Sequence, residues 1–268
     1  MKLRVNRIKQ CLREGRLATG VNVQFASPEV VEVVGASGYD FAMIDWEHGS
    51  FSFDVVVQMI RAAEAVDITP IVRIPGCDAV TIKRVLDAGA MGVVVPQIEN
   101  RAQAEEAARG ARYFDGSNEG ARGACPSTRA TRHLAEDWQA FARHSNEEIF
   151  LALAIECEEG LRNFEEIAAV PGLDAVFLGI FDLAQAMGFH GDMKHPQVLQ
   201  ALQPLLAHSR ARGLPIHATL VSADGDAAAK DTAYWVDAGA SIINCVSDRR
   251  VLSIGLRERR EAVARAGR

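Results

Sequence analysis

The chain has 268 residues, of which 49% are hydrophobic and 24% charged, and its net charge of −6 argues against a polyanionic partner such as nucleic acid. Its five cysteines are odd in number, widely spaced and without a CxxC pair, which excludes a disulfide framework or a zinc knuckle. No segment approaches the roughly 20 apolar residues of a membrane span, and the N-terminus lacks the apolar stretch of a signal peptide. We therefore expect a cytoplasmic protein with reduced thiols and no membrane contact.

Eight short apolar runs, rich in β-branched residues, predict buried strands: Leu17–Val23, Tyr39–Ile44, Thr69–Ile74, Met91–Pro96, Phe150–Ile155, Ala175–Gly179, Leu214–Leu220 and Ala240–Val246. Segments of helical period lie between them, at Phe53–Ala65, Asp78–Asp87, Arg101–Ala111, Leu161–Val170, Pro196–Arg212 and Asp226–Asp237. Strands that alternate with helices in this number predict a (β/α)8 TIM barrel, formed by residues 1–268 as a single domain. The alternative is an open doubly wound sheet with one miscounted strand.

Two segments depart from this alternation. Residues Tyr113–Thr131 are rich in Gly, Ser, Asn and Arg, and an irregular segment of this length indicates a lid or a binding loop. The last helix, roughly Asp248–Ala266, is highly charged. It is either a solvated surface helix or an arm that is exchanged between subunits.

The residues that follow the strands of a barrel converge on one mouth, where such enzymes carry out their chemistry. Glu156 and Asp182 follow the fifth and sixth predicted strands. Two carboxylates at this place suit a hard divalent cation, so we expect Mg²⁺, Mn²⁺ or Co²⁺ with water and substrate oxygens as further ligands. The alternative is a structural pair bonded to Lys, Arg or backbone amides.

Three further residues suggest acid–base and anion-binding chemistry. His48, in the run IDWEHG after the second strand, is a natural general base, although a lone His is more often a polar loop or core residue. Asp87 ends the helix after the third strand and could orient the imidazole. Arg73, in IVRIP, either binds a substrate carboxylate and stabilises negative charge on oxygen or forms a structural salt bridge.

Other polar residues are weaker candidates. His190 and His195 lie in a predicted loop, Arg122 either contacts an anion or braces its loop, and Cys157 has no evident His partner. The sequence contains no P-loop, GxGxxG, GxSxG or HExxH motif, so nucleotide binding and triad hydrolysis have no support.

The motifs IDWEHG, VRIP, LDAGAMGVVVPQIE, ARGACP, LAIE and LGIFDLAQAMGFHGD occur in an order and spacing that resemble the class II HpcH/HpaI aldolase family, from about Gly20 to Cys245. The resemblance implies a metal-dependent aldolase that cleaves or forms 4-hydroxy-2-oxo acids, giving pyruvate or a related 2-oxo acid and an aldehyde. It also implies a homo-oligomer, a trimer or hexamer, with exchanged C-terminal helices.

The resemblance assigns roles to the residues singled out above. It places the divalent metal on Glu156 and Asp182, the acid–base role on His48 with support from Asp87, and binding of the pyruvyl oxygen on Arg73. The expected substrate contacts are Arg73, Ala154, Gly179 and Leu220.

The sequence also departs from the family pattern. Ala154 stands where many members have a Gln that contacts the keto acid, and Ile180 and Ala184 stand where Pro and Ser are frequent. A keto acid bulkier than pyruvate, or a related lyase substrate, is therefore an open alternative.

The predicted reaction is aldol cleavage without a Schiff base, because Lys83 and Lys194 are not at strand ends. One rival function is a lyase on an acyl-CoA thioester of the malyl or citramalyl type, which needs basic residues on the rim. Only Arg122, Arg129 and Arg132 are available for that role. A second rival is a non-catalytic barrel that binds a keto acid, which would be expected to show gaps in the catalytic set.

Overall fold

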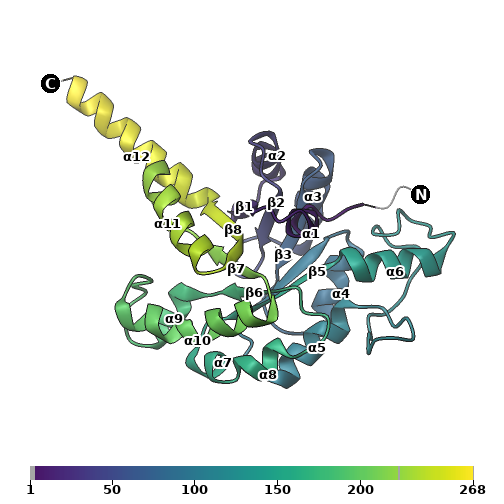
Figure 1. Ribbon diagram of the computed structural model, residues 1–268. Coiled ribbons are helices and arrows are strands. Elements are labelled where there is room, and N and C mark those ends of the chain that lie inside the picture. Colours follow the sequence, from purple (N-terminus) through teal and green to yellow (C-terminus); the bar gives the residue numbers. More distant parts are fainter. Residues whose placement is uncertain (1–3, 223, 268) are drawn as a thin grey trace.

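The protein is described by a computed structural model that covers residues 4–222 and 224–267. Eight parallel strands form a closed barrel in chain order, with β8 pairing with β1 (Figure 1). The strands are β1 (Ala18–Val23), β2 (Phe41–Asp45), β3 (Thr69–Arg73), β4 (Gly92–Val95), β5 (Phe150–Ile155), β6 (Ala175–Leu178), β7 (Ile216–Thr219) and β8 (Ala240–Ser247). The predicted (β/α)8 barrel is confirmed, and the open sheet is wrong.

Ten of the twelve described helices connect successive strands around the barrel, while α1 precedes β1 and α12 follows β8. They are α1 (Arg7–Arg13), α2 (Pro28–Ala36), α3 (Phe53–Ala65), α4 (Ala79–Asp87), α5 (Arg101–Ala111), α6 (Trp138–Glu148), α7 (Glu158–Arg162), α8 (Phe164–Ala168), α9 (Ile180–Ala186), α10 (Pro196–Arg212), α11 (Gly225–Asp237) and α12 (Asp248–Ala266). The single helix predicted at Leu161–Val170 is two short helices that meet at Asn163. The side chain of Asn163 donates to the backbone oxygen of Glu99 at 2.8 Å, which fixes the chain at this break.

The core has two layers because successive strand residues face opposite sides of the sheet. One apolar cluster lies between the barrel and its helices, and a second lies inside the barrel, where Phe41, Met43, Ile71, Phe150 and Phe177 are buried. This filled interior is a packed core. It leaves the ends of the barrel as the places where a site can form.

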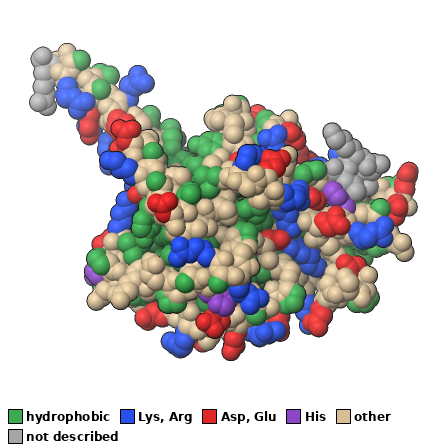
Figure 2. Space-filling view, in the orientation of Figure 1, with side chains coloured by type: hydrophobic (Ala, Val, Ile, Leu, Met, Phe, Trp, Pro, Cys, Tyr) green, Lys and Arg blue, Asp and Glu red, His purple; other side chains and the backbone are tan. Residues whose placement is uncertain are grey.

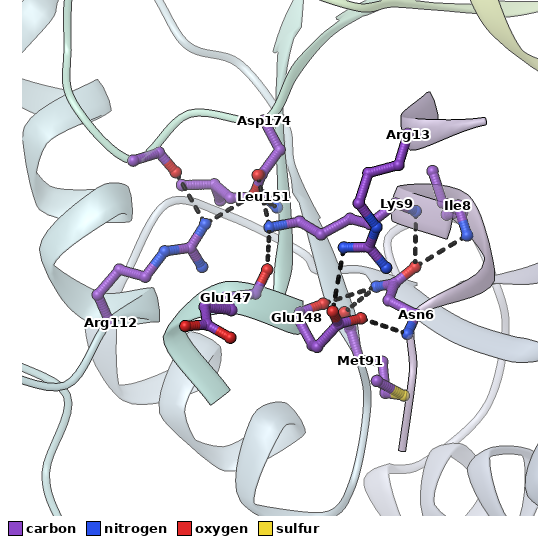
Figure 3. A network of polar contacts seen from close by, with 11 residues as sticks. Asn6, Ile8, Lys9, Arg13, Met91, Arg112, Glu147, Glu148, Leu151 and Asp174 are labelled. Atoms are coloured by element: carbon purple, nitrogen blue, oxygen red, sulfur yellow. Dashed lines mark hydrogen bonds and ion pairs between the residues drawn. The ribbon is translucent and has the colours of Figure 1, made fainter. Parts of the chain in front are cut away.

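The helix α1 closes the N-terminal end of the barrel, because its Ile8 and Cys11 belong to the interior cluster. Figure 3 shows the polar contacts around the start of this helix. Asn6 caps this helix by accepting hydrogen bonds from the backbone of Ile8 and Lys9, and its amide donates to the backbone oxygens of Met91 and Glu148. The carboxylate of Glu148 in turn accepts from the backbone N of Asn6 at 2.6 Å. These bonds fix the start of the chain to the entries of β4 and β5, so the open mouth is at the other end.

The helix α12 projects away from the barrel, and no side chain in its described length is buried (Figure 1). Four of its apolar residues are exposed, namely Val251, Leu252, Leu256 and Val263. Figure 2 shows apolar side chains where α12 leaves the body of the protein and charged ones along its projecting part. Such a helix is stable when another surface covers its apolar residues.

The segment between α5 and α6 has no helix or strand, in agreement with the irregular segment predicted there. Among the described residues, no helix combines the length and the apolar character that a membrane crossing requires.

One titratable group lies within the barrel itself. His217 is fully buried, with its ring edge-on to Phe41 and Phe177 at centroid distances of 5.6 and 4.9 Å. Burial lowers the pKa of His217 from 6.5 to about 3, and the positive charge of Arg73 acts in the same direction. The imidazole is therefore neutral in the folded protein.

This buried His217 predicts a loss of stability in acid. Between pH 6.5 and about 3, the unfolded chain binds a proton that the native barrel excludes, so the free energy of unfolding falls as the pH is lowered. The contribution is about 1.4 kcal/mol per pH unit within that window. Urea unfolding at several pH values should show a flatter dependence for His217→Gln than for the wild type. Equal slopes for the two proteins would contradict this account.

Candidate active site

Arg73 and Asp45 form a buried ion pair at the C-terminal end of the barrel. They end β3 and β2 and lie in register with each other. Nε of Arg73 donates to Oδ1 of Asp45 at 2.9 Å, and Nη2 donates to Oδ2 at 2.6 Å. Only 8% of Arg73 is exposed. Because two parallel bonds fix the plane of a guanidinium, Arg73 is held in one orientation.

Asp45 is the centre of a wider hydrogen-bond network. The side-chain amides of Asn22 and Gln24 donate to its Oδ2 at 3.3 and 2.8 Å, and the backbone N of His48 donates to Oδ1 at 3.3 Å. Burial alone would raise the pKa of Asp45, but the hydrogen bonds and charge of Arg73 outweigh it and lower that pKa. Asp45 therefore stays ionised and positions Arg73, a role that the sequence analysis did not assign.

Glu156 lies directly after β5 and is 7% exposed. Its Oε1 accepts from the backbone N of Gln97 at 2.6 Å. Gln97 has a φ of 56°, a conformation that is uncommon outside glycine and that concentrates at functional sites. Burial raises the pKa of Glu156 to about 7, and the carboxylates of Glu47 and Asp182 act in the same direction. A cation at this place would be strongly favoured.

Gly179 makes the room that Glu156 occupies. A Cβ at residue 179 would lie 2.3 Å from Cβ of Glu156 and 2.5 Å from its Oε2. Both distances are shorter than atoms tolerate, so no other residue type fits here without moving the carboxylate. Gly179, predicted as a substrate contact, thus has a positioning role in this structure.

His48 and Glu47 lie beside Arg73. The side chain of His48 is 53% exposed, and its Nε2 is 3.4 Å from Oε2 of Glu47. The same Oε2 is 3.3 Å from Nε of Arg73 and accepts no hydrogen bond from the described residues. Burial raises the pKa of Glu47. Glu47 was not singled out from the sequence, although it precedes His48 directly.

Asp182 lies in the first turn of α9, directly beyond β6. Its charge raises the pKa of both Glu47 and Glu156, so the three carboxylates interact electrostatically. Within residues 4–222 and 224–267, no three His, Cys, Asp or Glu side chains are close enough to form a complete ligand set. Mg²⁺ needs only one or two carboxylates, since water and substrate oxygens fill its other positions. Glu156 and Asp182 therefore fit a divalent cation.

The structure does not bring Asp87 to His48 within one chain. Asp87 is the last residue of α4, which returns the chain to the end where the strands begin, whereas His48 follows the end of β2. The Oδ1 of Asp87 instead accepts a hydrogen bond from Nη2 of the buried Arg122 at 2.7 Å. Within the chain, Asp87 is therefore the partner of Arg122.

Ala154 and Leu220 lie in different layers of the core. Ala154 is fully buried inside the barrel. Leu220 follows β7 and belongs to the layer between barrel and helices, where it lines a cavity of about 220 Å³ with Thr219 and Trp235. Ala154 therefore faces the inside of the barrel, whereas Leu220 faces the surrounding helices.

The arginines that a CoA-binding rim would need lie at the wrong end. Arg122, Arg129 and Arg132 line a cavity of about 880 Å³ together with residues that precede the strands, such as Thr69 and Met91. Arg129 pairs with Glu64 and donates to the backbone oxygen of Ala88 at 2.9 Å. The three arginines considered for the rival acyl-CoA lyase therefore do not line the mouth.

The weaker candidates have structural roles. His195 stacks on Phe189 at a centroid distance of 3.8 Å, and its Nδ1 accepts from the backbone N of Gln197 at the start of α10. Sγ of Cys157 accepts from the backbone N of Gly160 at 3.4 Å and so caps α7. His190 is exposed in the loop before α10.

Comparison with known proteins identifies the family of the chain. The sequence pattern of the HpcH/HpaI aldolase/citrate lyase family matches residues 18–247. The chain belongs to this family. It is 35% identical over 243 residues to a hydroxypyruvate/pyruvate aldolase of Sagittula stellata, covering 89% of this chain and 94% of that relative. It is 34% identical to a 4-hydroxy-2-oxovalerate aldolase of Novosphingobium aromaticivorans, covering 100% of this chain and 99% of that one.

A solved structure shares the whole architecture. An HpcH/HpaI aldolase/citrate lyase family protein from Burkholderia cenocepacia is 30% identical, with a TM-score of 0.87, and the match covers 98% of this chain and 100% of the other. The chain is therefore a carbon–carbon lyase of the HpcH/HpaI aldolase type, and the predicted family is confirmed. A divalent metal is supported at the level of this family.

Proposed function

We propose that this HpcH/HpaI aldolase cleaves or forms 4-hydroxy-2-oxo acids, giving pyruvate or a related 2-oxo acid and an aldehyde. The observation that carries the proposal is the arrangement of the mouth, where the oriented Arg73 interacts with the carboxylates of Glu47 and Glu156. Burial, together with the charges of Glu47 and Asp182, raises the pKa of Glu156. Glu156 and Asp182 hold the divalent metal, for which we propose Mg²⁺, Mn²⁺ or Co²⁺. When bound, the ion polarises the 2-oxo group of the substrate.

The side chains of this aldolase supply the remaining functions. Nε and Nη2 of Arg73 are bound by Asp45, while among the described residues no group accepts a hydrogen bond from Nη1. A guanidinium carries five N–H donors, so Nη1 is free to bind a substrate oxygen and to stabilise negative charge as the C3–C4 bond breaks. His48, exposed beside Glu47, removes the proton of the 4-hydroxyl, directly or through a water.

The proposal is tested by pyruvate release from a panel of 4-hydroxy-2-oxo acids, with each metal ion and with EDTA. Glu156→Gln keeps the shape of the side chain but removes its charge, and we expect a loss of about 100-fold or more in kcat/KM. Calorimetric titration should show the same variant losing affinity for the ion. Glu158→Gln, an exposed carboxylate two residues along, is the matched control and should retain wild-type activity.

Two outcomes would contradict the proposal. Release that continues in EDTA would remove the metal from the reaction, and full activity of Glu156→Gln would remove that residue from the site. Arg122, Arg129 and Arg132 line the opposite end of the barrel and so do not support the rival acyl-CoA substrate.

We further propose a homo-oligomer, a trimer or hexamer, in which α12 packs against a neighbouring copy. The support is the exposed apolar set on this helix, Val251, Leu252, Leu256 and Val263, because a monomer would leave it in water. The cytoplasmic location stays a prediction.

A further inference from the structure

A cavity of about 880 Å³ lies at the N-terminal end of the barrel, opposite the mouth. Its walls come from the start of the chain, from residues that precede β3, β4 and β5, and from the loop between α5 and α6. Ligand sites in proteins commonly have volumes of about 300–1,000 Å³. Because the packed interior of the barrel separates this cavity from the mouth, it is not part of the site described above.

The charged side chains that line this cavity do not balance. The whole chain carries a net charge of −6, yet among the described residues the cavity is lined by six arginines and four carboxylates. A concave surface with an excess of one charge concentrates ions of the opposite sign. The six arginines are Arg4, Arg7, Arg16, Arg122, Arg129 and Arg132.

The excess positive charge lies around Glu64, near the C-terminal end of α3. Arg4 and Arg129 both pair with Glu64, so two guanidinium groups share one carboxylate. Three other arginines of the cavity have a carboxylate each: Arg7 pairs with Asp67 at 2.6 Å, Arg16 with Glu14 at 2.8 Å and Arg122 with Asp87 at 2.7 Å.

The two remaining carboxylates of the wall are bonded elsewhere. Asp40 accepts from the backbone N of Thr19 at 2.9 Å, and Glu148 pairs with Arg13 at 3.1 Å and accepts from the backbone N of Asn6. Neither carboxylate pairs with the arginines around Glu64 among the described residues. The excess charge at Glu64 is therefore not neutralised within the chain.

Arg132 and His133 add basic side chains at the same cavity. Both are exposed in the loop before α6, and within residues 4–222 and 224–267 no carboxylate pairs with either of them. Burial lowers the pKa of Arg4, and the charges of Arg129 and Arg132 act in the same direction. The backbone at Arg132 and His133 has φ values of 54° and 71°. Such left-handed residues other than glycine are uncommon and concentrate at functional sites.

Arg129 is held in place without a ligand. It donates to Oε1 of Glu64 at 2.8 Å and to the backbone oxygen of Ala88 at 2.9 Å. Gly89 permits this approach, because a Cβ at residue 89 would lie 2.4 Å from Nη1 of Arg129. A guanidinium that is already ordered loses little further freedom when an anion binds beside it.

We propose that this cavity binds a small polyanion, a phosphate ester or a polycarboxylate with two or more negative charges, beside Arg129, Arg132 and His133. A planar guanidinium binds phosphate and carboxylate oxygens alike through its parallel N–H donors. A cluster that only fastened the N-terminus to the barrel would be expected to have one carboxylate for each arginine, as the other pairs of the cavity do. The ligand is separate from the substrate, which binds at the opposite end.

The experiment is calorimetric titration of the full protein, free of metal ions, with 2,3-bisphosphoglycerate and with tricarballylate. We expect at least one of them to bind, with an affinity that falls as NaCl is raised, and to raise the midpoint of thermal unfolding. Binding of the first alone identifies a phosphate ester, binding of the second alone a polycarboxylate, and binding of both shows that charge is sufficient. Binding of neither would overturn the proposal.

Substitutions locate the bound anion. Arg132→Gln removes an exposed, unpaired charge and should weaken binding about tenfold or more, and His133→Asn, which tolerates a left-handed backbone, should also weaken it. The matched control is Arg143→Gln, an exposed arginine on α6 that does not line the cavity, which should bind as the wild type does. Glu156→Gln should also bind normally, because Glu156 lies at the mouth.

Two results with these variants would contradict the cavity as the site. Unchanged affinity in both Arg132→Gln and His133→Asn would remove the loop before α6 from binding. A change of affinity in Glu156→Gln, in either direction, would place the anion at the mouth. Neither result bears on the aldolase proposal, which is tested by pyruvate release.

Discussion

Replacing Arg73 with methionine is expected to lower kcat/KM for aldol cleavage by about 1,000-fold and the free energy of unfolding by about 3–5 kcal/mol. The two losses have different causes. Activity falls because the site loses the guanidinium that binds the substrate oxygen. Stability falls because Asp45, which is fully buried and doubly bonded to Arg73, is left as an unpaired charge.

A second substitution separates these causes. In the double variant Asp45→Asn with Arg73→Met, no buried charge is left alone, so most of the unfolding free energy should return while the activity stays low. Urea unfolding and steady-state kinetics on the single and double variants measure both quantities. A single variant as stable as the wild type would contradict the ionised, paired state of Asp45, and an active double variant would remove Arg73 from catalysis.

Gly179→Ala is expected to lower kcat/KM by about 100-fold, because displacement of a catalytic group by about 1 Å has this effect. The new Cβ cannot stay 2.3 Å from Cβ of Glu156, so the carboxylate must move away from its present place. Affinity for the divalent ion should fall together with activity, which calorimetric titration of the variant would show.

The control for this substitution is Gly225→Ala. A Cβ at residue 225 meets no atom within 4 Å, so activity and ion affinity should stay at wild-type values. If Gly179→Ala also binds the ion and turns over substrate normally, then the position of Glu156 described above is wrong.

The strands could be predicted because their residues are apolar on both faces. Each of the eight predicted runs overlaps an observed strand, since burial against helices outside and packed side chains inside gives near-continuous apolar sequence. The short helices could not be predicted in the same way. At α7 and α8, the break depends on the bond from Asn163 to the distant Glu99, which local periodicity does not reveal.

The site was predictable wherever a residue directly follows a strand. The positions of Glu156, His48 and Arg73 at one end of the barrel could be predicted, because strand ends converge by topology. Asp87 ends a helix, so its place in the sequence carried no such information, and the structure places it beside Arg122. Asp45 lies in the same run of residues as His48. Its role in positioning Arg73 depends on a bond between the neighbouring strands β2 and β3, which the sequence does not show.

The inward orientation of His217 could not be predicted, for a different reason. His217 and Thr219 alternate with Ile216 and Ala218 in β7, so the period of two is present in the sequence. In a run that is otherwise apolar, however, alternation does not say which face is the interior. That assignment requires the register with β6 and β8.

The closure of the barrel by α1 has a consequence for synthesis on the ribosome. The helix is among the first parts of the chain to emerge, but its partners Met91, Glu148 and Asp174 follow much later. Arg7 can meet Asp67 and Thr69 early, but the contacts to Glu148 and Asp174 cannot form until more than half of the chain has been translated. Until then its apolar residues Ile8 and Cys11, which pack inside the finished barrel, have no cavity to enter. The final docking of α1 on the barrel thus follows the synthesis of these late residues.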